Sequence, residues 1–157
     1  MKAAIDSSVL IVLGKLGYLK LVRELFEKLV VAESVFEEVR GDEVFTEVSE
    51  LIGIGLVEIA KGSKYELLNL LSSSLGKGEA ETIAVALELK ADVALLDDLR
   101  ARKVARRLKV KVMGILAVLK VLVDLKLVKE KPESLCEKLV NQGFWVDAEL
   151  CLKTLKG

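Results

Sequence analysis

The chain has 157 residues, of which 52% are hydrophobic and 31% charged, a composition typical of one globular domain with a sizeable core. Lysine plus arginine and aspartate plus glutamate both number 24, which excludes a globally basic nucleic-acid-binding protein but not a local basic patch. The first apolar run is short and is broken by Lys15, so it predicts no membrane span and no secretion signal, and we expect a cytoplasmic protein.

Short strand-like runs alternate along the chain with longer segments of helical periodicity. In chain order we predict a strand at 2–5, helices over 7–16 and 18–29, a strand at 29–32, helices over 34–41 and 42–52, a strand at 56–60, helices over 64–71 and from 78 onward, a strand at 92–96, a helix over 98–108, a strand at 110–113, and helices over 115–125, 132–141 and 147–155. Strands separated by helical crossovers predict an α/β fold with a parallel sheet covered on both faces.

Local signals predict how several of these segments begin and are joined. Ser7 or Ser8 is expected to cap the first helix and Ser34 the third, because a serine hydroxyl can accept a bond from a free backbone N–H. No linker divides the chain, so we predict one domain over 1–157, in which 114–157 form a C-terminal helical extension.

The two cysteines lie far from any CxxC pattern, in segments predicted to be helical. We expect Cys136 and Cys151 to be buried or half-buried thiols, and not a disulfide or a zinc site.

Four acidic residues stand at the ends of apolar strands or at the edges of apolar helices. They are Asp6, Glu38, Glu79 and Asp97. Each has an ordinary explanation alone, as a helix cap, a partner of the helix dipole or a solvated side chain. In an open parallel sheet, however, ligands bind beyond the carboxyl ends of the strands, where Asp6 and Asp97 fall. Four converging carboxylates in a chain without histidine predict a site for a hard cation, Mg²⁺ or Mn²⁺.

Four motifs occur in an order and spacing that resembles the PIN domain family, specifically its small prokaryotic members related to VapC-like toxins. These motifs are AIDSSVLI, SVFEEV, GEAETIAVALEL and VALLDDLRARKVARRL. The resemblance spans the whole chain and implies a three-layer α/β/α sandwich. It also implies that Asp6, Glu38 and Asp97 are catalytic metal ligands, with Glu79 in place of the usual aspartate. Further candidates for the site are Glu81 as an alternative to Glu79, Asp98 as another ligand, and Ser7 as an orienting hydroxyl.

The function that the resemblance implies is that of a Mg²⁺- or Mn²⁺-dependent ribonuclease, in which metal-activated water hydrolyses a phosphodiester. The absence of histidine agrees with this, because it excludes a histidine general base. The resemblance also suggests the toxin of a type II toxin–antitoxin pair, with an antitoxin partner and a homodimer. Two alternatives stay open: an inactive PIN-like module that binds RNA or protein, and a phosphatase or phosphotransfer domain. The second is disfavoured because VKVMG lacks the hydroxyl that such a site needs.

A basic stretch over 100–111 follows the last of the four acids. Its apolar residues are spaced to face the core, which directs the basic side chains outward, and Arg100, Lys103 and Arg107 are the predicted contacts to a nucleic-acid backbone. A solvated helix face is the alternative explanation. The later helices are strongly apolar, so they either complete the core or form an interface with a second copy or an antitoxin helix. Phe144 and Trp145 are expected to pack against the domain.

Overall fold

Five parallel strands form the centre of the protein in a computed structural model that describes residues 1–61, 65–144 and 146–157. The strands are β1 (Lys2–Ile5), β2 (Lys28–Ala32), β3 (Val57–Ala60), β4 (Val93–Leu95) and β5 (Val112–Met113). They lie in the order β3-β2-β1-β4-β5, and each neighbouring pair is parallel. The direction of winding therefore reverses between β1 and β4. Their carboxyl ends lie side by side at this reversal, which is the usual ligand-binding position of such sheets.

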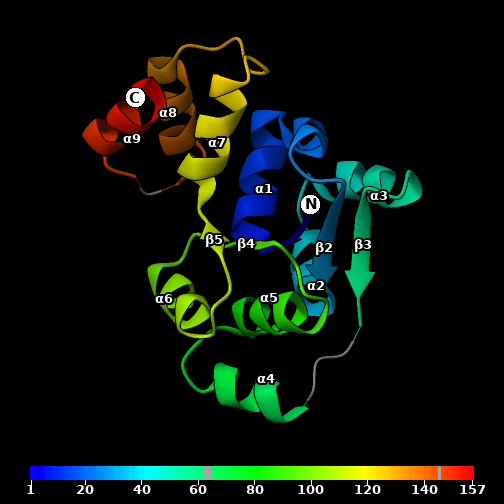
Figure 1. Cartoon of the computed structure of the whole chain (residues 1–157). Coiled ribbons are helices and arrows are strands. Elements are labelled where there is room, and N and C mark those ends of the chain that lie inside the picture. The colour runs from blue at the N-terminus through cyan, green and yellow to red at the C-terminus, as the bar shows by residue number, and fades with distance from the viewer. Residues whose placement is uncertain (62–64, 145) are drawn as a thin grey trace.

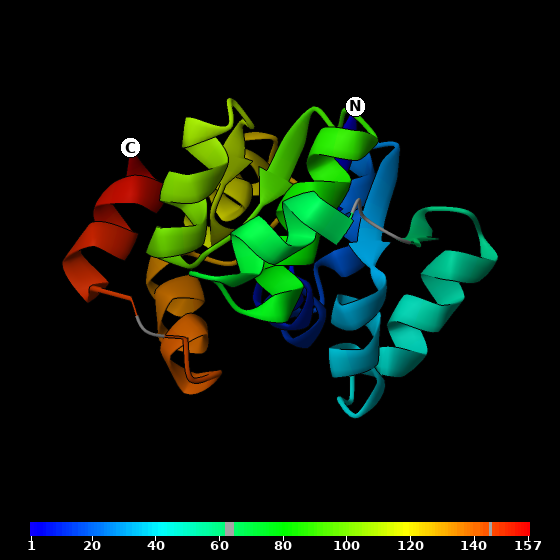
Figure 2. The ribbon, with the colours of Figure 1, turned by 90° about the horizontal axis from the view of Figure 1, so that it is seen from below.

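Helices cover both faces of this sheet, which confirms the predicted α/β class (Figure 1). They are α1 (Ser7–Leu16), η1 (Leu19–Glu24), α2 (Glu33–Arg40), α3 (Phe45–Gly53), α4 (Tyr65–Ser72), α5 (Lys77–Glu88), α6 (Leu99–Arg107), α7 (Ile115–Asp124), α8 (Pro132–Asn141) and α9 (Ala148–Lys156). Helix α5 packs on β1, β2 and β4, and α2 packs on β2 and β3. Figure 2 shows α4, α5 and α6 on the side of the sheet nearest the viewer. The inner strands β1, β2 and β4 are almost fully buried because helices lie on both of their sides.

The structure differs from the predicted elements mainly after Gly17, where a regular helix over 18–29 was expected. The segment instead forms the 3-10 helix η1, and both Leu25 and Phe26 donate their N–H groups to the Val22 carbonyl. Phe26 is fully buried and β2 begins at Lys28, so the chain has to leave the helical path early. Burial of the aromatic ring overrides the leucine periodicity here.

Two predicted helix caps are also wrong. Asp6, and not Ser7 or Ser8, caps α1, because its carboxylate accepts the Ser7 N–H. Helix α2 begins one residue before Ser34, after Ala32, and has no side-chain cap. The predicted start of the fourth-region helix at Lys64 lies outside the described residues.

The C-terminal helices stand together beside α1 in Figure 1. Helix α7 contacts both α1 and α9, and α9 also contacts α8. Leu119 of α7 is fully buried, and Leu116, Val123 and Leu127 pack partly buried against the same core, so this apolar surplus does complete the core. Phe144 packs there as well, whereas Trp145 lies outside the described residues.

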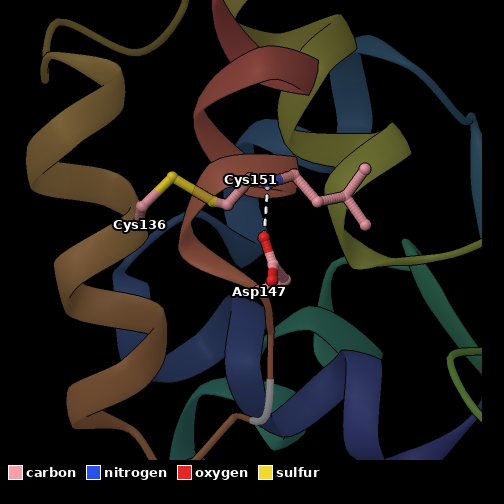
Figure 3. The surroundings of a disulfide bond; sticks show 4 residues. Cys136, Asp147 and Cys151 are labelled. Atoms are coloured by element: carbon pink, nitrogen blue, oxygen red, sulfur yellow. Dashed lines mark hydrogen bonds between the residues drawn. A yellow bond between two sulfur atoms is a disulfide. The ribbon is translucent and has the colours of Figure 1, made fainter.

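The expectation of two free thiols is contradicted, because Cys136 of α8 and Cys151 of α9 form a disulfide (Figure 3). Both cysteines are buried, and Asp147 caps α9 next to them by accepting the Leu150 N–H. Two cysteines fifteen residues apart in separate helices carry no spacing signal. The bridge forms because α8 and α9 pack side by side and bring the two Cα atoms to 6.0 Å.

Among the described residues, the search for a helix long and apolar enough to cross a membrane finds none.

The disulfide is expected to stabilise the helical extension. Closing a loop of this length removes about 3 kcal/mol of conformational entropy from the unfolded chain, so a reductant should lower the melting temperature of the parent protein. The double variant Cys136→Ala/Cys151→Ala is the matched control, because its melting temperature should not respond to reductant. Thermal unfolding of both proteins with and without dithiothreitol measures this. A parent protein with the same melting temperature in both buffers contradicts the expectation.

Candidate metal and nucleic-acid site

A cavity of about 380 Å³ opens at the carboxyl edge of the sheet, where β1 and β4 end. Its walls carry five carboxylates from four separate segments of the chain, namely Asp6, Glu38, Glu79, Asp97 and Asp98. We call this cavity the acid pocket. All four acids singled out from the sequence therefore lie in it, together with the additional candidates Asp98 and Ser7.

Asp6 is the most deeply placed of these acids, with 5% of its surface exposed. It directly follows β1, and its N–H extends the pairing with β4 by donating to the Leu95 carbonyl at 3.1 Å. Its carboxylate accepts the Ser7 N–H at 2.8 Å. Burial raises the pKa of Asp6 to about 6; the Ser7 N–H opposes this, and the nearby charges of Glu38 and Asp98 add to it.

Glu38 reaches the acid pocket from the outer face of α2, and a hydroxyl holds it in place. The Ser7 hydroxyl donates to Glu38 Oε2 at 2.7 Å. The approach of α5 to α2 at this point needs a glycine, because a Cβ on Gly78 would lie 2.6 Å from Glu38 Oε1 and 3.6 Å from Asp6 Oδ1. Gly78 therefore lets three segments bring their carboxylates together.

Glu79 lies in the first turn of α5 and borders the acid pocket. Burial raises its pKa to about 7, with further increases from the negative charges of Asp98, Asp6 and Glu38, while Arg100 opposes the shift. Glu81 does not border this pocket, although the sequence left it as an alternative. Two residues along a helix correspond to a rotation of about 200°, so Glu81 lies on the other side of α5.

Asp97 and Asp98 follow β4 and have different local partners. Asp97 accepts the Ile115 N–H at 3.2 Å, and burial raises its pKa, against the opposing effects of that N–H and of Arg102. Asp98 caps α6 by accepting the Ala101 N–H at 2.9 Å. Gly114 makes room for this arrangement, because a Cβ there would lie 2.9 Å from Arg102 Nη1 and 3.1 Å from Asp97 Oδ1.

Basic side chains flank the acid pocket on two sides. On α6, Arg100, Lys103 and Arg107 are exposed, as the spacing of its apolar residues predicts. Arg102 instead turns inward beside Asp97, and its Nε is buried without a hydrogen-bond partner. Lys77 also borders the pocket, and sequence analysis missed it. Its place in the first turn of the GKGEAE helix, two residues before Glu79, was the available signal.

The charge balance of the acid pocket suits a divalent cation. Five carboxylates face one lysine, and the raised pKa values of Asp6 and Glu79 show that their negative charge is poorly compensated. All the acidic donors are carboxylate oxygens, the ligands that Mg²⁺ and Mn²⁺ prefer. In residues 1–61, 65–144 and 146–157, however, no three acidic or cysteine side chains are already arranged to hold an ion. The donor chemistry fits a cation, and binding one requires side-chain rotation.

The fold and this acidic pocket at the switch point define a PIN-like protein of the α/β class. A sequence model described as a PIN domain, DUF3368, matches residues 2–157, and the chain belongs to this family. Among solved structures, a PilT N-terminus domain protein from the hyperthermophilic archaeon Sulfolobus solfataricus is similar, with 21% sequence identity and a TM-score of 0.49, over 73% of this chain and 87% of that one. None of the curated proteins matches the sequence.

The raised pKa values predict that the metal-free protein loses stability as pH rises from about 4 to about 7. Over this range the folded protein binds more protons than the unfolded chain, so the stabilisation present below the unfolded pKa is lost as pH passes through the folded pKa. For the buried Asp6, the shift from 3.8 to about 6 corresponds to at most about 3 kcal/mol. Denaturant unfolding at a series of pH values in EDTA measures the effect.

The variant Asp6→Asn keeps an oxygen that can cap α1 but removes the titrating group, so it should gain stability over the parent as pH rises. Asp147→Asn is the control, since Asp147 caps α9 outside the acid pocket. A stability difference between Asp6→Asn and the parent that is the same at every pH contradicts the assignment.

Proposed function

We propose that this protein is a divalent-metal-dependent ribonuclease that cleaves RNA at the acid pocket. The observation that carries the proposal is the convergence of Asp6, Glu38, Glu79 and Asp97, from four distant segments, on one cavity at the switch point of the sheet. PIN domains are typically nucleases, and membership of that family supports phosphodiester hydrolysis as the reaction.

The residues that would hold Mg²⁺ or Mn²⁺ are Asp6, Glu38, Glu79 and Asp97, with Asp98 close enough to add to the charge. When bound, such an ion neutralises charge on the phosphate and activates a water for attack on phosphorus. Its arrival also favours the ionised form of carboxylates whose pKa the empty pocket raises.

The protein's own side chains have positioning roles in this proposal. Ser7 fixes the Glu38 carboxylate through its hydroxyl, and the Ile115 N–H does the same for Asp97. The buried, unpartnered Nε of Arg102 beside Asp97 gives the guanidinium a free donor near the site of phosphate binding. Arg100, Lys103 and Arg107 then form an exposed basic face next to the acid pocket that attracts the RNA backbone.

The cellular role that we propose is the toxin of a type II toxin–antitoxin pair, acting as a homodimer. The support is the motif resemblance, together with exposed apolar side chains on the C-terminal helices, such as Val140 and Leu150, which are 53% and 54% exposed. Expression of the chain alone should arrest growth, and expression of Asp6→Asn should not. A neighbouring gene for a small DNA-binding protein should relieve the arrest.

Metal binding and RNA cleavage test the central proposal. Calorimetric titration with Mn²⁺ should show binding to the parent that is lost in Asp6→Asn and Asp97→Asn, because each removes a carboxylate from the acid pocket. The same variants should fail to cleave a labelled RNA. Asp124→Asn is the control, since Asp124 lies exposed on α7 and pairs with Lys120. Unchanged Mn²⁺ binding in both pocket variants would end the proposal, and release of free phosphate without strand cleavage would point to phosphatase chemistry.

Gly78→Ala tests the packing that brings the carboxylates together. The added methyl group would displace the Glu38 carboxylate, which lies at the flexible end of its side chain, so the fold should be retained. Loss of the correct Glu38 position should weaken Mn²⁺ binding by roughly 10–100-fold. Gly53→Ala is the matched control, because nothing lies within 4 Å of a Cβ at that helical glycine. Equal Mn²⁺ affinities for the two variants would contradict this role of Gly78.

A second candidate function is an inactive PIN-like module that binds RNA or protein. It is favoured by the finding that no three acids in the described part of the chain are arranged in advance for an ion. It predicts RNA binding to the parent in EDTA, with no cleavage when Mn²⁺ is added.

A further inference from the structure

A second cavity, of about 510 Å³, lies beside the acid pocket between α2, the end of β3 and α5. Its walls include Glu81, Ser34, Phe36, Lys61 and Lys77. We call it the Glu81 cavity. Its size falls within the roughly 300–1,000 Å³ that small-molecule sites occupy. Lys77 borders both cavities, so a ligand in one lies next to a ligand in the other.

The Glu81 cavity contains two buried polar atoms without partners. Glu81 is only 9% exposed, yet its Oε2 is fully buried and accepts no hydrogen bond. The Ser34 hydroxyl, on the facing helix α2, is also buried and unpaired. A buried carboxylate kept only for packing normally finds a donor, because leaving it unsatisfied costs free energy. Both atoms border the same cavity, which indicates that a bound group satisfies them.

The charges around the Glu81 cavity indicate what kind of group this is. Three acids, Glu33, Glu37 and Glu81, face three bases, Arg40, Lys61 and Lys77. This even balance favours neither a metal ion nor a phosphate. It suits a neutral, planar group that offers donors to the carboxylate and an acceptor to a hydroxyl or an ammonium. The half-buried ring of Phe36 adds an apolar wall.

Among the RNA bases, guanine fits this pattern. Its Watson–Crick edge presents two adjacent donors, N1–H and the N2 amine, which a carboxylate can accept together, and O6 beside them is an acceptor. Adenine and cytosine place an acceptor where guanine has N1–H, and uracil has one donor between two carbonyls. Proteins read single-stranded RNA through such edges.

We propose that the Glu81 cavity is a guanine-binding subsite for the RNA strand whose backbone enters the acid pocket. The proposal rests on the function proposed above. Glu81 accepts the N1–H and N2 amine of the base, Ser34 or Lys61 donates to O6, and Lys77 lies between the two cavities near the connecting phosphate.

The experiment measures the affinity of the full-length protein for fluorescein-labelled, uridine-rich short RNAs, by anisotropy in EDTA. Three probes differ at one position, which is guanosine, inosine or adenosine. Because a well-formed bidentate contact discriminates by roughly 1–3 kcal/mol, the guanosine probe should bind about tenfold more tightly than the adenosine probe. Inosine lacks the N2 amine and should also bind more weakly than guanosine. Equal affinity for the three probes, or no measurable affinity for any, would overturn the proposal.

Variants assign the discrimination to the cavity. Glu81→Gln should reduce the guanosine affinity to that of inosine, because a carboxamide presents one acceptor where the carboxylate has two. Ser34→Ala should weaken guanosine binding in part, and Glu79→Gln, in the neighbouring pocket, should keep the guanosine preference. A preference unchanged in Glu81→Gln would place the recognition elsewhere and refute the subsite. The comparison of guanosine with inosine on the parent needs no variant, so it stands even if Glu81→Gln does not fold.

Two further results separate this subsite from the proposed nuclease. Mn²⁺-dependent cleavage by a parent that does not distinguish guanosine from inosine would refute the subsite alone. A Glu81-dependent guanosine preference in a parent that cleaves no RNA would refute the nuclease and retain the subsite. Guanosine monophosphate that competes as strongly as the guanosine RNA would assign the cavity to a free nucleotide and overturn the strand assignment.

Discussion

Electrostatic repulsion among carboxylates at one edge of a parallel sheet is the constraint on which this structure depends. Asp6 and Asp97 are delivered there by adjacent strands, and Glu38 and Glu79 lean over the same edge from two helices. The raised pKa values of Asp6 and Glu79 show that the fold leaves this repulsion largely uncompensated. A protein holds acids in such a position at a cost in stability, and a bound divalent cation is what relieves it.

The remainder of the fold accommodates this crowding through local packing. Gly78 allows α5 to approach α2 closely enough for three segments to meet, and Gly114 gives Arg102 and Asp97 their space. Backbone and side-chain donors then fix individual carboxylates, as Ser7 does for Glu38. These contacts restrict where each oxygen lies without neutralising its charge. The pocket therefore keeps both its negative charge and its position, which are the two properties that an ion and a phosphate require.

Much of this arrangement follows from the sequence, because strand ends are marked by apolar runs that stop at an acid. That rule places Asp6 and Asp97, and hence the site. It cannot decide between Glu79 and Glu81, because the rotation of α5 about its axis is set by packing against α2 and the sheet. For the same reason the sequence gives no sign of the disulfide at Cys136, which depends on how α8 meets α9. Local pattern predicts which elements form, and long-range packing determines which of their faces meet.

The most direct test of the central claim is a titration of the side-chain carboxyl groups by carbon-detected nuclear magnetic resonance, with and without Mg²⁺. The account predicts that the metal-free protein shows a pKa of about 6 for Asp6 and about 7 for Glu79. It further predicts that Mg²⁺ lowers both pKa values while those of exposed acids on α7 and α9 do not change. Ordinary pKa values for Asp6 and Glu79 that do not respond to Mg²⁺ would contradict it.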